Sequence, residues 1–269
     1  MINYTERLTQ LIQDIVERIP TLSFIDIREL LVFARYGRSR AQGAYATCHC
    51  LNLPESEPGY YFWRERATGK LTRRSDWFVT KSPIVQIGQR PINYLISFAL
   101  PRFCDQVLEG SRKAMFYDGM PDWVAKLDTV VHELYHIDPA QPGIRRIGTS
   151  DSSAARWHGP MFLADVAAMV KQYLASKPDP FVFGFLALDF KALEQQFEGI
   201  VGTTFRTYPS FPQRYLDPLP VQPPEPEALV VPVKSPTVPT RYTEDDLCIR
   251  QFLEHTSHRL VQKGRHRAA

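Results

Sequence analysis

The stretch 127–137 reads LDTVVHELYHI, and the interpretation of the whole chain begins from it. At about 100° per residue, an α-helix places His132 and His136 about 40° apart on one face. Glu133 falls at the margin of that face. The apolar positions fall within about 60° of Leu134, on the opposite side of the helix: Trp123, Leu127, Val130, Val131 and Ile137. The pattern therefore predicts a helix over 122–137, with a core stripe on one side and two imidazoles on the other.

Two imidazoles one helical turn apart can bind a single metal ion. A glutamate between them can act as general base on a metal-bound water. With seven histidines in 269 residues, the HExxH pattern would also arise by chance in about one chain in a hundred. The amphipathic periodicity of the segment favours the metal site over an accidental match.

His158 is the candidate third ligand, because catalytic zinc usually takes three protein ligands and keeps a fourth position for water. It lies in ARWHGPMFLADVAAMVKQYL (155–174), where apolar residues recur at helical spacing and predict a second helix over 158–176. The 21 intervening residues are rich in Pro, Gly and Ser, enough to turn one helix back on the other. Asp165 lies on the face of His158; it either orients a ligand imidazole or is an ordinary solvated acid.

VHELYH followed some twenty residues later by HGPMF resembles the SprT-like zincins, and closely the metallopeptidases of that type in phage and bacterial genomes. The match covers about residues 121–175. By position, the resemblance implies a zincin-like fold in which His132, His136 and His158 bind Zn²⁺ and Glu133 is the catalytic base. Many members also carry a Cys-rich zinc ribbon. This chain has no CxxC pair, so the resemblance does not bring the family's DNA-associated roles with it.

Composition is typical of a cytoplasmic enzyme. The chain is 44% hydrophobic, enough for one substantial core, and its formal net charge of +3 is too small to indicate a nucleic-acid partner. The sequence has no apolar run of about 18 residues that would span a membrane. Its first residues predict an amphipathic helix rather than a signal peptide. The basic C-terminal tail leaves a weak case for nucleic acid, and His255 and His258 are expected to be solvated.

The four cysteines are interpreted in two ways. Cys48 and Cys50 alternate with His49 on an expected strand, so both thiols face one side. A second metal site would need two further ligands, whereas Cys104 and Cys248 are isolated in sequence. Buried free thiols in a reducing compartment are the favoured interpretation.

Strand-like segments precede the helices, which favours an α+β class with a mostly antiparallel sheet above the motif helix. The expected strands are 27–36, 43–52, 59–65, 70–79 and 92–99, with a short helix at 190–200 and a strand or extended segment at 203–211. Eight prolines between Asp217 and Thr240 predict a linker or surface arm. We therefore expect a metallopeptidase domain over 1–215, a Pro-rich segment over 216–240, and a helix with a basic tail over 241–269.

The expected function is hydrolysis of peptide bonds by a zinc-activated water, with Glu133 taking the proton of the water and passing it to the leaving amine. A peptide or protein substrate would pair with an edge strand, for which 92–99 (INYLISFA) is the candidate. Arg156 and Tyr135 are candidates for stabilising the oxyanion, or are structural. The alternative is a zincin-fold binding module, attached to DNA or to a protein, whose zinc is structural. The peptide substrate and the oligomeric state stay open.

Overall fold

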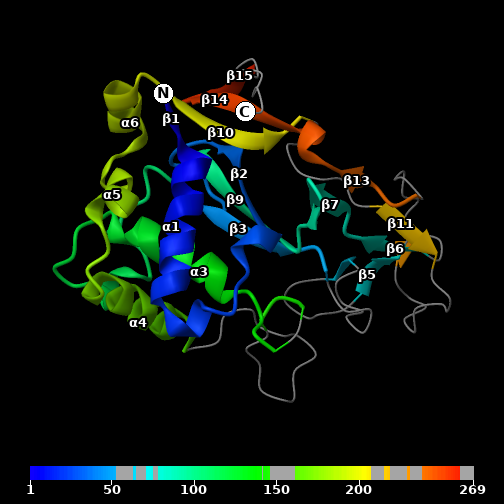
Figure 1. The fold of residues 1–269 in the computed structure, drawn as a ribbon, viewed down its shortest axis with the longest axis horizontal. Helices are drawn as coiled ribbons and strands as arrows, with labels where there is room; N and C mark the ends of the chain where they lie inside the picture. The colour runs from blue at the N-terminus through cyan, green and yellow to red at the C-terminus, as the bar shows by residue number, and fades with distance from the viewer. Residues whose placement is uncertain are drawn as a thin grey trace.

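The computed structural model describes residues 1–52, 63–64, 71–74, 78–140, 142–145, 161–206, 215–218, 229–230 and 238–260. Within these residues, helices gather on one side of small sheets rather than alternating with strands one by one (Figure 1). The α+β class expected from the sequence is confirmed at this level.

The sheet beside the motif helix has three strands, in the order β2 (Leu30–Gly37), β9 (Tyr94–Pro101), β3 (Ala46–Cys50). Strand β9 pairs in parallel with β2 and antiparallel with β3, so this sheet is mixed and the expected antiparallel pairing holds only for β3. Every residue of β9 except Tyr94 is buried, as is usual for a central strand with covered faces.

Helices α1 (Tyr4–Arg18) and α3 (Val124–Tyr135) pack against one face of this sheet, and α4 (Phe162–Ala175) packs against α3 (Figure 1). They share a core with Val32, Ala34, Ile96 and Phe98, whose side chains lie on that face of the sheet. The amphipathic pattern predicted for the first helix is confirmed by the buried residues Leu8, Leu11, Ile12, Ile15 and Ile19. No helix in the described ranges is long and apolar enough to cross a membrane.

The motif helix α3 differs from the predicted amphipathic picture, because it is enclosed on nearly all sides. Every residue of α3 except His132 is buried. Its polar residues tolerate this because they find partners: the Lys126 ammonium, for example, donates to the carbonyl oxygens of Leu186 (2.8 Å) and Leu188 (2.7 Å). The 3.6-residue period located the core stripe but could not show that neighbouring segments also cover the polar side.

A second sheet has the order β1 (Ile2–Asn3), β10 (Ile200–Phe205), β14 (Leu247–Leu253), β15 (Thr256–Leu260). The helix expected near the C-terminus is therefore wrong, since strands β14 and β15 occupy that segment. Pairing with β10 decides the conformation: Cys248 lies opposite Thr204 and Phe252 opposite Ile200, and both Cys248 and Phe252 are buried.

The two sheets approach each other closely where β10 passes β2. A methyl group added to Gly202 would lie only 3.1 Å from the Cβ of Ala34 and 3.2 Å from a methyl of Thr5, so glycine permits this contact.

The remaining elements are short. The helices are α5 (Pro180–Phe183) and α6 (Phe190–Phe197), and the latter confirms the expected short helix. The 3₁₀ turns are Pro20–Leu22, Ile27–Glu29, Ala114–Phe116, Gly184–Ala187 and Glu244–Asp246. The other strands are β4 (Trp63–Arg64), β5 (Leu71–Arg74), β6 (Phe78–Lys81), β7 (Ile84–Ile87), β8 (Arg90–Pro91), β11 (Tyr215–Pro218), β12 (Leu229–Val230) and β13 (Arg241–Tyr242).

Parts of the Pro-rich segment pair with earlier strands. Strand β11 is antiparallel to β6, β12 is parallel to β5, and β13, just beyond the segment, is parallel to β7. The strand expected at 70–79 is represented by β5 and β6, and β4 lies within the expected 59–65. The rest of these predicted ranges lies outside the described residues.

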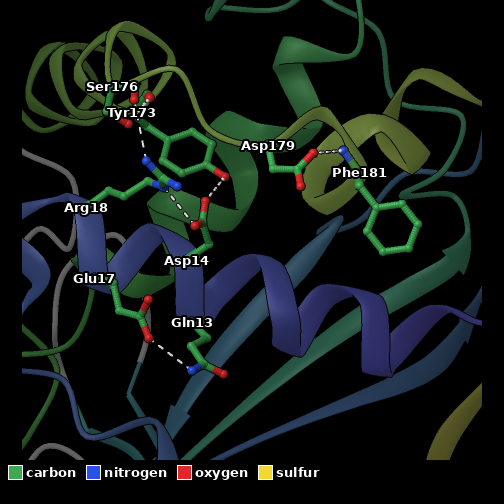
Figure 2. Close-up of polar contacts among 8 residues, drawn as sticks. All are labelled: Gln13, Asp14, Glu17, Arg18, Tyr173, Ser176, Asp179 and Phe181. Carbon is green, nitrogen blue, oxygen red and sulfur yellow. Dashed lines mark hydrogen bonds and ion pairs between the residues drawn. The ribbon is translucent and has the colours of Figure 1, made fainter.

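Helix α4 is fastened to α1 by a polar contact at its C-terminal end (Figure 2). The Tyr173 hydroxyl donates to one carboxylate oxygen of Asp14 at 2.6 Å, and the Arg18 Nε donates to the other at 2.7 Å. Arg18 also reaches the carbonyl oxygen of Ser176 at 3.4 Å. This contact joins α1 to α4, whose first residue lies at the candidate site.

Candidate metal centre

His132 and His136 are brought together at the end of the motif helix. Their ring centroids are 4.9 Å apart and their planes nearly perpendicular. Phe162, the first residue of α4, packs against both rings, at 4.9 Å from His132 and 5.0 Å from His136. A buried phenyl ring in contact with both imidazoles restricts the orientations that they can adopt.

These imidazoles fit a zinc ion in type and arrangement, because neutral ring nitrogens are preferred zinc ligands and both rings lie at one place. His158, the predicted third ligand, lies outside the described residues, as does Arg156. Within the described ranges no group of three or more His, Cys, Asp or Glu side chains gathers as a metal site. The three-histidine site therefore stays a prediction of which the structure describes two members.

Glu133 lies on the β3 side of the histidine pair, with only 6% of its surface exposed. Its Oε2 accepts a hydrogen bond from the Cys48 amide of β3 at 2.7 Å. Burial raises the pKa of Glu133 to about 7, while the Cys48 amide and the charges of Lys113 and Arg35 act in the opposite direction. A carboxyl with a pKa near neutrality suits proton transfer, because it can both accept and release a proton at working pH.

Strand β3, rather than β9, is the edge strand beside the motif helix. The expectation that 92–99 forms this edge is wrong, because β9 lies between β2 and β3. The backbone groups of Tyr45 and Leu51 bond to β9 and to the residue before it. Because backbone groups alternate in direction along a strand, the even-numbered residues between them direct their amides away from β9. The Cys48 amide is one of these, and Glu133 is its partner. Sequence alone could not choose between two adjacent apolar strands.

A second group of side chains lies on the opposite side of the histidine pair. The Tyr135 hydroxyl donates to Oδ2 of Asp165 at 3.1 Å, and the Arg145 guanidinium carbon lies 4.2 Å from the centroid of the Tyr135 ring. The sequence left two roles open for Asp165, orienting a ligand imidazole or facing solvent. The hydrogen bond that the structure describes for it comes instead from Tyr135. Arg145 was missed by sequence reasoning, because it lies in a turn-rich segment without any motif.

Sequence reasoning also missed a buried polar cluster one turn before the motif. The Lys113 ammonium lies 2.5 Å from Oδ1 of Asp128 and donates to the Thr129 hydroxyl at 2.6 Å. The Tyr117 hydroxyl donates to Oδ2 of Asp128 at 2.6 Å, and Thr129 donates to Gln106 at 2.9 Å. Asp128 and Thr129 lie four residues before His132 and Glu133 respectively. The cluster therefore contacts the helix one turn before the candidate metal ligands.

The four cysteines are free thiols. Burial raises the pKa of Cys50 to about 11 and that of Cys104 to about 12, and it also raises the pKa of Cys48. These are properties of inert core thiols rather than of reactive ones. Among the predicted tail histidines, His255 is exposed.

No protein-family model, no curated protein and no solved structure matches this chain. The likeness to SprT-like zincins therefore rests on the quoted motifs alone. Any functional conclusion has to be argued from the site itself.

Proposed function

We propose that this protein is a zinc-dependent metallopeptidase acting in the cytoplasm on a peptide or protein substrate. The observation that carries the proposal is the placement of Glu133, buried between the histidine pair and the edge of β3. A zinc ion that only fastens two helices needs no general base beside it, whereas hydrolysis by a zinc-bound water does. The free cysteines are consistent with a reducing compartment.

His132, His136 and His158 would hold the ion, which would polarise the scissile carbonyl and lower the pKa of a water molecule. Glu133 would accept the proton of the attacking water and pass it to the leaving amine. Its hydrogen bond from the Cys48 amide holds one carboxylate oxygen toward β3 and leaves the other for proton transfer.

The deciding experiment compares Glu133→Gln with wild type. Gln keeps the shape and an oxygen that can accept the Cys48 amide, but it cannot act as a base. We expect one zinc per chain in both proteins by elemental analysis, and a loss of hydrolysis of about 100- to 10,000-fold in the variant. Glu194→Gln makes the same change at an exposed residue of α6 and should behave as wild type.

The substrate in this assay is an unfolded protein, offered with and without DNA. Equal hydrolysis by wild type and Glu133→Gln would exclude the base. Zinc content unchanged by His158→Ala would exclude the third ligand. Inactivity of zinc-loaded wild type under every condition would favour the binding module in which zinc is structural.

A further inference from the structure

The second histidine of the motif stands at a weak point of the helix. Helix α3 ends at Tyr135, and His136 is its C-terminal capping residue. The last carbonyl groups of a helix have no partner within the helix and tend to fray unless another segment satisfies them. A ligand at this position holds its imidazole in place only if the helix end is fixed from outside.

Arg145 supplies that fixation through its backbone and its side chain together. Its amide donates to the carbonyl oxygen of His136 at 2.6 Å, and its Nε donates to the carbonyl oxygen of Tyr135 at 2.9 Å. Its guanidinium stacks on the Tyr135 ring at 4.2 Å, a cation–π contact. A cation at the C-terminus of a helix also interacts favourably with the helix dipole.

The segment that carries Arg145 is itself anchored. Ile144 forms an antiparallel bridge with Ile137, and the Asp138 amide donates to the Gly143 carbonyl at 3.3 Å. The Tyr94 hydroxyl, from β9, lies 3.2 Å from both the amide nitrogen and the carbonyl oxygen of Gly143. The turn after the motif helix is thus tied to the central strand of the sheet, so Arg145 holds the helix end against a rigid element.

We propose that Arg145 is a positioning residue for the metal site, which fixes His136 in the orientation needed to bind zinc. The inference rests on the proposed metal site and adds a residue that the motif does not contain. The direction in which zinc affinity changes when Arg145 is replaced distinguishes positioning from a simple effect of charge. A positive charge near a divalent cation repels it, so removing charge alone would strengthen zinc binding, whereas loss of positioning weakens it.

The test is Arg145→Met, which keeps an unbranched apolar side chain but removes the guanidinium that donates to Tyr135 and stacks on its ring; the backbone amide that donates to His136 remains. Zinc affinity is measured by competition with a chromogenic chelator, well below the unfolding temperature. We expect affinity to fall by about 10- to 100-fold, the usual effect of losing a group that orients a metal ligand. Amide hydrogen exchange of the metal-free protein should also accelerate at residues 136–138.

Arg206 provides a matched control, because it makes the same two kinds of contact away from the site. Its amide donates to the Asp246 carbonyl at 2.9 Å and its Nε to the Asp245 carbonyl at 2.8 Å. Arg206→Met should leave zinc affinity and exchange at 136–138 unchanged.

Unchanged or tighter zinc binding by Arg145→Met, with wild type binding zinc normally, would overturn the role of Arg145 alone. An equal loss of affinity in Arg206→Met would overturn it too, because the effect would then be general destabilisation. Failure of wild type to bind zinc would instead overturn the metal site, and with it the assignment of Arg145.

Discussion

Replacing Lys113 by Met should destabilise the protein severely, because it leaves Asp128 buried without its counter-charge. The ammonium and the carboxylate are 2.5 Å apart, with 17% and 2% of their side-chain surfaces exposed. Removing one partner of a buried ion pair costs about 3–5 kcal/mol. We therefore expect a loss near 4 kcal/mol, a large share of the about 5–15 kcal/mol that stabilises a typical domain.

The measurement is urea unfolding followed by circular dichroism, with the double variant Lys113→Met/Asp128→Leu completing the cycle. The double variant should recover part of the loss, since neither charge of this pair then remains. Arg28→Met is the matched control: Arg28 pairs with Asp26 at 2.6 Å, but the two side chains are 65% and 36% exposed. That change should cost much less, because solvent screens an exposed ion pair. A loss in Lys113→Met as small as in Arg28→Met would refute the reasoning that burial gives the pair its importance.

Two further predictions concern other regions. Tyr173→Phe removes the hydroxyl that donates to Asp14 beside Arg18, and a hydrogen bond to a charged group is worth about 1.5–3 kcal/mol, so urea unfolding should show a loss in that range. A loss below about 0.5 kcal/mol would show that the contact in Figure 2 does not hold α4 to α1. Cys50 and Cys104, with pKa values raised by burial to about 11 and about 12, should resist iodoacetamide at pH 8 in the native protein and react after unfolding. Rapid native labelling of either thiol, detected by peptide mass spectrometry, would contradict the burial of these side chains.

Much of the local structure could be predicted from the sequence. The periodicity of residues 1–19 and 122–137 located α1 and α3, and strand-like runs located β2, β3 and β9. Within the candidate site, the four-residue spacing of His132 and His136 is enough to place both imidazoles on one helix face. These properties follow from backbone geometry within a single element, which depends only on residues near in sequence.

Other features depended on contacts between distant segments. Two contacts join residues 15 to 85 positions apart: the buried pair of Lys113 with Asp128, and the bond of Glu133 with the Cys48 amide. The position of β3 at the edge of its sheet also depends on pairing between distant strands. The strand conformation of β14 was also decided from outside, by its pairing with β10. The sequence alone determined which residues could form a metal-binding helix face. Only the tertiary structure decided that Glu133 is buried and that Arg145 bonds to the end of the helix, because burial and hydrogen-bond partners belong to the packed chain rather than to any segment of it.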